Sequence, residues 1–229
     1  MELVDKLSNR QYIDGEWVES SNKNTRDIIN PYNQETIFTV AEGTKEDVER
    51  AILAARRSFE DGEWSLETSE VRGKKVRAVA DKIKENREEL AKLETLDTGK
   101  TLEESYADMD DIHNVFMYFA GLADKDGGEI INSPIPNAES KVVKEPVGVV
   151  TQITPWNYPL LQASWKIAPA LATGCSLVMK PSEITPLTTI RVFELMEEVG
   201  FPKGTINLVL GAGSEVGDVR SEEHTSELQ

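Results

Sequence analysis

Two patterns of hydrophobic and polar positions follow one another along the chain and change near Gly127. Before this glycine, apolar residues recur mainly at helical spacing in long, highly charged segments. After it, short runs of β-branched residues alternate with shorter helical segments. The first pattern predicts a mostly helical half, and the second predicts strands and helices in alternation.

The first half is predicted to contain a hairpin and three helices. Residues 12–18 are expected to form the hairpin, because an Asp-Gly turn lies between alternating apolar positions. Thr44 and Asp47 have the spacing of a capping box, which predicts that a helix begins there. The other expected elements are a turn at 30–33, a strand over 36–40, and helices over 69–94 and 102–123, which the turn at 97–100 separates.

The second half is predicted to form a parallel sheet. Residues 147–153 are a continuous run rich in β-branched side chains, which is typical of a strand buried on both faces. The remaining expectations are an irregular segment over 130–136, strands over 140–143, 176–180 and 205–210, and helices over 160–172 and 187–199. This β-α-β-α-β alternation indicates an α/β protein with helices beside its sheet. We expect residues 205–210 to leave an open apolar edge that promotes aggregation.

Composition narrows the classes of function. The chain has 229 residues, of which 39% are hydrophobic, and its 41 acidic and 25 basic side chains give a net charge of −16. A globular fold suits this mixture, whereas the acidity disfavours nucleic acid and a basic membrane anchor. No apolar run of about 18 residues is present and the start does not resemble a signal peptide, so we expect a cytoplasmic protein.

The chain's single cysteine and its histidines do not indicate a catalytic or zinc centre. Cys175 excludes an intrachain disulfide, and with two histidines it is too little for a structural zinc site. Cys175 precedes a predicted strand and is interpreted as a small buried hydrophobe rather than a nucleophile. His113 lies beside Asp110 and Asp111 and is interpreted as a partly packed surface histidine.

Two polar segments follow the predicted parallel strands, where ligands bind in such sheets. Thr154-Pro155-Trp156-Asn157 follows the first strand, and the Asn157 amide can donate a hydrogen bond to a developing oxyanion. Spacing alone does not distinguish this role from simple capping of the next helix by Asn157.

The second segment, Lys180-Pro181-Ser182-Glu183, follows the next strand. Lys180 as donor and Glu183 as acceptor can hold the hydroxyls of a ribose, or they can form an ordinary surface ion pair. Further on, Gly211 and Gly213 begin a glycine loop after the last strand, which allows the backbone to approach a ligand closely.

In this order and spacing, the segment 154–160, the block 166–174 and the segment 180–183 resemble the aldehyde dehydrogenase superfamily. The resemblance covers residues 10–219, and the segments 97–100, 120–125 and 156–166 are most similar to betaine aldehyde dehydrogenases. It implies an incomplete Rossmann-like NAD-binding domain with a parallel sheet. Its expected parts are an N-terminal helical and strand region at 1–138, part of an oligomerisation strand at 139–147, and the β-α-β NAD-binding core at 148–219.

The resemblance also implies roles for single residues. Asn157 corresponds to the family's oxyanion-stabilising amide, and Lys180 and Glu183 correspond to the pair that holds the adenosine ribose of NAD. A carboxylate at Glu183 favours NAD over NADP, because it repels a ribose phosphate. The further implied positions are Thr154, Pro155 and Trp156 along the cofactor channel, Pro181 and Ser182 beside the ribose pair, Gly211 and Gly213 at the adenine end, Lys166 in a charge relay, and Ile29 and Asp97 at a monovalent cation.

Family chemistry supplies the expected function. A cysteine attacks the aldehyde, hydride passes to NAD, and a glutamate-activated water hydrolyses the resulting thioester. The resemblance places that cysteine and glutamate beyond the glycine loop, so we expect the 229-residue chain to be inactive and the full-length enzyme to oxidise betaine aldehyde to glycine betaine as a homo-oligomer. The alternatives are a relative that oxidises a semialdehyde and a non-catalytic nucleotide-binding module.

Residues 220–229 differ from everything before them. They contain one apolar residue, Leu228, and they interrupt the helix expected after the glycine loop. The segment resembles a translated sequencing-library adapter joined to a truncated reading frame, and we interpret it as non-native. An exposed polar tail is the alternative.

Overall fold

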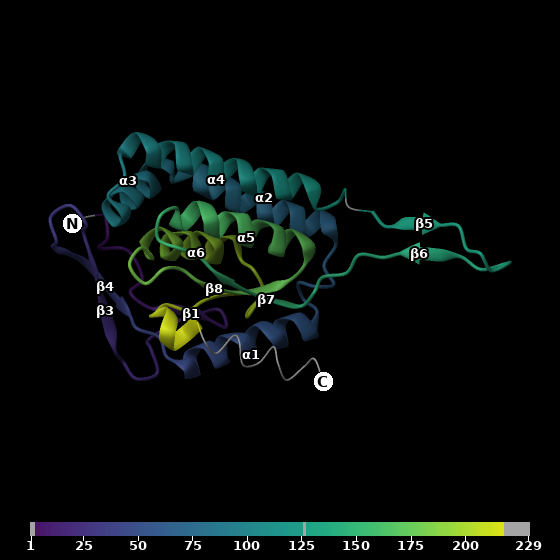
Figure 1. The fold of residues 1–229 in the computed structure, drawn as a ribbon, viewed down its shortest axis with the longest axis horizontal. Coiled ribbons are helices and arrows are strands. Elements are labelled where there is room, and N and C mark those ends of the chain that lie inside the picture. The colour runs from purple at the N-terminus through teal and green to yellow at the C-terminus, as the bar shows by residue number, and fades with distance from the viewer. Residues whose placement is uncertain (1–2, 126, 218–229) are drawn as a thin grey trace.

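A five-stranded sheet with the order β2-β1-β9-β8-β7 lies at the centre of the fold (Figure 1). The computed structural model describes residues 3–125 and 127–217, and the tail at 220–229 lies outside them. The strands β7 (Val149–Ile153), β8 (Ser176–Lys180) and β9 (Ile206–Leu208) are parallel. The antiparallel hairpin of β1 (Gln11–Ile13) and β2 (Glu16–Val18) extends the sheet. The predicted α/β class and hairpin are therefore confirmed.

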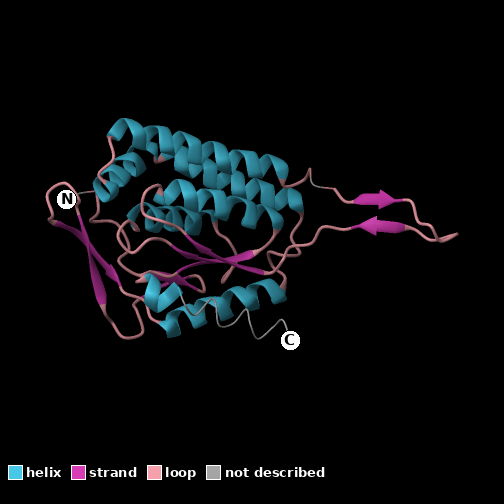
Figure 2. Ribbon diagram, viewed as in Figure 1, coloured by secondary structure: helices cyan, strands magenta, loops and turns pink. Residues whose placement is uncertain are grey.

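Helices cover both faces of this sheet (Figure 2). One helix, α1 (Lys45–Asp61), crosses one face, and the predicted capping box of Thr44 and Asp47 is present at its start. On the other face α5 (Pro159–Thr173) and α6 (Leu187–Val199) form a layer, which a second layer of helices covers. The outer layer contains α2 (Ser69–Glu85), α3 (Arg87–Thr98) and α4 (Leu102–Leu122). Among the described residues, no helix is both long and apolar enough to span a membrane.

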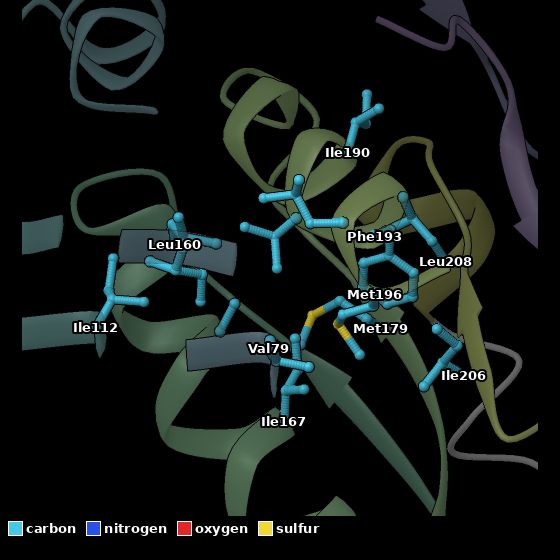
Figure 3. Packing of buried hydrophobic residues seen from close by; sticks show 14 of the residues in the cluster. Val79, Ile112, Leu160, Ile167, Met179, Ile190, Phe193, Met196, Ile206 and Leu208 are labelled. Carbon is cyan, nitrogen blue, oxygen red and sulfur yellow. The ribbon is translucent and has the colours of Figure 1, made fainter. Parts of the chain in front are cut away.

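The main core lies between the sheet and the helices of these two layers. Figure 3 shows Phe193 and Met196 of α6 beside Met179 of β8, with Ile167 of α5 nearby, and all four are fully buried. A smaller cluster fills the space between α1 and the opposite face of the sheet. The two cores pack against both faces of the sheet. The carboxyl ends of the parallel strands β7, β8 and β9 therefore lie side by side, and this end of the sheet is called its carboxyl edge below.

The single helix predicted over 69–94 is wrong, because the structure has two helices there. Asn86 leaves the helical conformation with φ −103° and ψ 17°, and its side-chain amide donates to the Lys82 carbonyl at 2.8 Å. Ile83 and Leu90 are both fully buried and stand seven positions apart, so the apolar face continues across the break. Hydrophobic spacing therefore gave no sign of it.

The irregular segment expected over 130–136 contains part of a strand. The strand β5 (Glu129–Ile131) pairs antiparallel with β6 (Ser140–Val142), and the hairpin extends away from the body of the molecule (Figure 1). Every residue of β5 is exposed, so no buried face imposed alternation on its sequence. A further two-stranded sheet joins β3 (Thr25–Ile29) to β4 (Thr36–Ala41), which confirms the strand expected over 36–40.

The predicted open edge at residues 205–210 is also wrong. The strand β9 is buried and lies between β8 and β1, where Tyr12 pairs with Leu208. The edge strands of this sheet among the described residues are β2 and β7, and β7 residues Val149 to Thr151 are only partly buried. The expectation that 147–153 is buried on both faces fails for the same reason.

We predict that the 229-residue chain self-associates through this edge of β7, because unpaired strands add further strands. Ile153→Lys adds a charge at a 42% exposed edge position and is expected to reduce the association measured by sedimentation velocity. Leu66→Lys, at an 84% exposed position outside the sheet, is the control and is expected to change nothing. A monodisperse, monomeric wild-type chain at micromolar concentration would contradict this prediction.

Candidate functional site

A buried lysine and a glutamate meet at the carboxyl edge of the sheet. Lys180 ends β8, and its Nζ lies 2.8 Å from Oε2 of Glu183. The Lys180 side chain is 8% exposed and that of Glu183 is 33% exposed, so this is not a surface ion pair. The Thr154 backbone N–H donates to the Lys180 carbonyl at 3.2 Å, which brings the first polar segment beside the second.

The Glu183 carboxylate is charged and oriented by several donors. Partial burial acts to raise its pKa, but the hydrogen bond from Lys180 and backbone N–H groups, including that of Gly213, outweigh burial and lower the pKa. A carboxylate held in this way accepts hydrogen bonds from hydroxyl groups while Lys180 donates. Pro181 and Ser182, both buried, fix the turn that joins the two charged residues.

The segment after β7 presents three side chains to solvent. Thr154 is buried and its Oγ1 has no hydrogen-bond partner, whereas Pro155, Trp156 and Asn157 are exposed. The N-cap of the following helix α5 is Tyr158, and no side chain caps it. The alternative in which Asn157 caps the helix is therefore wrong. No hydrogen bond joins the Asn157 amide to another described residue.

The glycine loop reaches the same edge from β9. Gly211 has φ +142°, and a Cβ there would lie 3.0 Å from the Gly43 carbonyl oxygen, so a side chain at this position would be strained. Gly213 is exposed, and its backbone N–H acts on the Glu183 carboxylate by lowering its pKa. The structure therefore brings Lys180, Glu183 and the glycine loop together, with the 154–157 segment beside them.

Two aromatic side chains near Asn157 were not singled out from the sequence. Tyr158 is 44% exposed and Trp165 is 53% exposed, and their seven-residue spacing corresponds to about two helical turns. Lys100 contacts one of these rings, because its Nζ lies 4.3 Å from the centre of the Tyr158 ring. The exposure of Tyr158 at the N-cap of α5 and of Trp165 on that helix is a tertiary feature, and spacing alone does not reveal it.

Within the described residues, no hydrogen bond or ion pair joins Lys166 or the expected cation residues Ile29 and Asp97 to the Lys180–Glu183 pair. Lys166 is half-buried on α5, and its carbonyl accepts from the Gln152 amide at 2.9 Å. In the part of the chain that the structure describes, no contact joins its ammonium to Asn157, Lys180 or Glu183. Within the same residues, no group of three or more His, Cys, Asp and Glu is arranged to hold a metal.

Asp97 is nevertheless an unusual carboxylate. Its Oδ2 accepts from the Leu187 N–H at 2.9 Å, but its buried Oδ1 has no partner. Burial raises the pKa of Asp97 well above its usual range, and the charge of Glu94 adds to this rise. A Cβ on Gly99 would lie 2.9 Å from Pro31, so the end of the strand that contains Ile29 packs beside the end of α3.

The remaining candidates have structural surroundings. Cys175 is 3% exposed at the amino end of β8, whereas Asn157 follows the carboxyl end of the parallel strand β7, so they lie at opposite ends of the sheet. The interpretation of Cys175 as a buried hydrophobe is confirmed. His113 is half-buried, with its Nδ1 3.0 Å from the Ala80 carbonyl oxygen, which confirms the partly packed histidine.

The glycine loop and the buried Lys-Glu pair lie beyond the carboxyl ends of parallel strands, where open α/β sheets bind their ligands. The sequence model of the aldehyde dehydrogenase family matches residues 17–226, and the chain belongs to that family. It is 66% identical over 212 residues to betaine aldehyde dehydrogenase of Bacillus subtilis and 47% identical over 219 residues to the peroxisomal aminoaldehyde dehydrogenase 1 of Pisum sativum. These matches cover 93% and 92% of the chain but only 43% of either relative.

Solved structures agree with this assignment. A crystal structure of betaine aldehyde dehydrogenase from Staphylococcus aureus in complex with NAD⁺ superposes with a TM-score of 0.96 and 89% sequence identity. The match covers 96% of this chain and 44% of that one. The resemblance to the superfamily and to its betaine aldehyde members is therefore confirmed, and the chain spans less than half the length of these relatives.

Proposed function

We propose that this chain forms the NAD-binding part of an enzyme that oxidises an aldehyde to a carboxylic acid, with betaine aldehyde as its substrate. The observation that supports the cofactor is the buried Lys180–Glu183 pair beside the glycine loop. NAD, when bound, accepts the hydride. Lys180 donates to the adenosine ribose and Glu183 accepts from it, Pro181 and Ser182 fix their turn, Gly211 and Gly213 border the adenine, and Thr154, Pro155 and Trp156 line the channel.

The Asn157 amide is proposed to stabilise the oxyanion that forms on the aldehyde. Its exposure beyond β7 and its lack of a protein partner leave the N–H groups available to a substrate. Lys166 is proposed to act in a charge relay. It lies on α5, two helical turns or more from Asn157 along the chain.

Tyr158 and Trp165 support a cationic substrate. Their exposed rings can attract the trimethylammonium group of betaine aldehyde through cation–π interactions. The relatives named for betaine aldehyde and for aminoaldehydes fit this chemistry, because both substrates have a cationic nitrogen. A semialdehyde with a terminal carboxylate would lack this attraction.

Steady-state NADH formation by the full-length enzyme tests the proposal. We expect betaine aldehyde to give the highest kcat/KM, an aminoaldehyde a lower one, and a carboxylate semialdehyde the lowest. A preference for the semialdehyde, or reduction of NADP in place of NAD, would contradict the proposed function.

A monovalent cation is proposed to bind at Asp97 and Ile29. The unpaired, buried Oδ1 of Asp97 would gain a partner, and backbone carbonyls near Ile29 can complete an oxygen shell.

We also propose that the exposed hairpin of β5 and β6 contributes to a homo-oligomer of the full-length enzyme, since Ile130 and Val143 are 82% and 71% exposed.

Glu183→Gln is predicted to raise the affinity for NADP relative to NAD by about tenfold, because it removes a negative charge beside the expected 2′-phosphate while Lys180 remains. Calorimetric titration of both nucleotides into the full-length enzyme measures the ratio. Glu88→Gln is the matched control, since Glu88 also pairs with a lysine, Lys92, at 2.5 Å on α3. An unchanged ratio in Glu183→Gln would remove Glu183 from the ribose site.

A further inference from the structure

An ion pair near the β3–β4 hairpin reaches the glycine loop from 170 residues away in the sequence. Arg26 lies in β3, and Glu42 directly follows β4. The guanidinium donates twice to this carboxylate, from Nε to Oε2 at 2.5 Å and from Nη2 to Oε1 at 2.6 Å. The Oε1 atom of Glu42 also accepts the backbone N–H of Ala212 at 3.1 Å.

Gly43, the residue after Glu42, also contacts this loop through its backbone. The Gly43 N–H donates to the Leu210 carbonyl at 2.8 Å, and a Cβ on Gly43 would lie only 2.3 Å from that oxygen. On the loop side, a Cβ on Gly211 would lie 3.0 Å from the Gly43 carbonyl oxygen. The corner formed by Glu42 and Gly43 is therefore packed directly against residues 210–212.

The arginine makes this arrangement possible. The Glu42 side chain is only 18% exposed, and a carboxylate so poorly hydrated needs a cation or several donors. The hydrogen bond from Arg26 is the main cause of the lowered pKa of Glu42. The two-point contact also fixes the direction of the carboxylate, which a single lysine contact would not do.

Two carboxylates thus face neighbouring amides of one loop. Glu42 accepts from the Ala212 N–H, and the Gly213 N–H lowers the pKa of Glu183. Orienting the first amide fixes the Gly211–Ala212 peptide plane, one peptide unit before the Gly213 N–H, and so restricts the path of the backbone beside Glu183. We propose that Arg26 and Glu42 are positioning residues that hold the glycine loop in its cofactor-binding conformation. This inference rests on the proposed function of the loop as part of the NAD site.

The test is NAD binding to the full-length enzyme, measured by calorimetry and by steady-state kinetics. We expect Glu42→Ala to raise the Kd and KM for NAD about tenfold, with kcat and the KM for the aldehyde within about twofold of wild type. Arg26→Ala is expected to act mainly through Glu42 and to raise the Kd about threefold, and the double variant should lie close to Glu42→Ala. Glu42→Gln keeps an oxygen for the Ala212 N–H and should recover most of the affinity.

Asp110→Ala is the matched control. It breaks another two-point pair with the same geometry, with Arg87 Nε to Asp110 Oδ1 at 2.5 Å and Nη2 to Oδ2 at 2.6 Å, on α3 and α4. We expect it to leave the NAD Kd unchanged. If Glu42→Ala does not fold, Arg26→Ala tests the inference, and an unchanged NAD Kd in that variant would overturn it.

The outcomes separate this inference from the proposed function. A wild-type enzyme without measurable NAD binding would overturn the proposed function and this inference with it. Normal NAD binding by the wild type, together with an unchanged Kd in the folded Arg26→Ala and Glu42→Ala variants, would overturn the inference alone. Additive effects of Arg26→Ala and Glu42→Ala would show that Arg26 does not act through Glu42 and would also overturn it.

Discussion

Asn157→Ala is expected to lower kcat of the full-length enzyme about 10²- to 10³-fold, the loss typical of removing one oxyanion donor. The amide is exposed beyond the carboxyl end of β7, and the cap of α5 is Tyr158 rather than Asn157. Its loss should therefore reduce transition-state stabilisation without disturbing the helix. The NAD Kd is expected to stay within about twofold, because the ribose pair is built from a different strand.

Steady-state kinetics and calorimetry on the same preparation check this prediction. Asn114→Ala, on the exposed face of α4, is the control and should retain wild-type kcat. A kcat for Asn157→Ala within about threefold of wild type would remove Asn157 from the reacting centre.

Lys100→Met is expected to destabilise the fold by about 3–5 kcal/mol, because it leaves buried carboxylates without their cation. The Lys100 side chain is 12% exposed, with its Nζ 2.5 Å from Asp108 Oδ2 and 3.5 Å from Glu94 Oε1. Glu94 is fully buried, and its second oxygen accepts from the Thr188 hydroxyl at 2.7 Å. This network connects α3 and α4 to the start of α6, and the contact with Tyr158 connects it to the candidate site.

The loss should depend on pH. Burial already raises the pKa of Glu94, and removing the Lys100 charge, which acts against that rise, would raise the pKa further. A carboxyl with a folded-state pKa above its unfolded value binds more protons in the folded state, so stability falls as pH rises between the two values. The difference between Lys100→Met and wild type is therefore expected to be smaller at about pH 5 than at about pH 8.

Urea unfolding at both pH values measures this difference. Lys74→Met is the control, because Lys74 pairs with Glu70 on the exposed face of α2 and its loss should leave the midpoint unchanged within error. Equal midpoints for Lys100→Met and wild type at about pH 8 would show that the buried acids do not depend on this lysine.

Local sequence signals predicted the elements whose ends are fixed by local chemistry. The capping box at Thr44 and the Asp14-Gly15 turn were visible because they depend on residues a few positions apart. The helix α6 has the predicted bounds, since Pro186 precedes it and Gly200 ends it. Asn86 broke a continuous apolar pattern through its own side chain, which spacing does not register.

The edges of the sheet depended on tertiary structure. Strand order in a parallel sheet is not given by strand order in the sequence, so the last strand, β9, was wrongly expected at the edge. In the structure β1 covers it, although the two strands lie almost 200 residues apart. The edge on the parallel side of the sheet is β7, the first of the parallel strands, and β2 forms the other edge.

One part of the candidate site was predictable from the sequence, and another part depended on tertiary structure. The rule that ligands bind beyond the carboxyl ends of parallel strands indicated Thr154 to Asn157 and Lys180 to Glu183 from the sequence. Contacts between distant segments were not predictable from spacing, and these include Glu42 with Ala212 and Lys100 with Tyr158. Both contacts connect the predicted segments to the helices and hairpins that surround them.

The central claim is that the carboxyl edge of this sheet binds NAD through Lys180 and Glu183. A crystal structure of the full-length enzyme with NAD tests it most directly. We predict that the adenosine ribose hydroxyls lie within hydrogen-bond distance of Lys180 Nζ and a Glu183 carboxylate oxygen, beside Gly211 and Gly213. An adenosine ribose bound elsewhere, with the Lys180–Glu183 pair closed and without contact to the nucleotide, would contradict it.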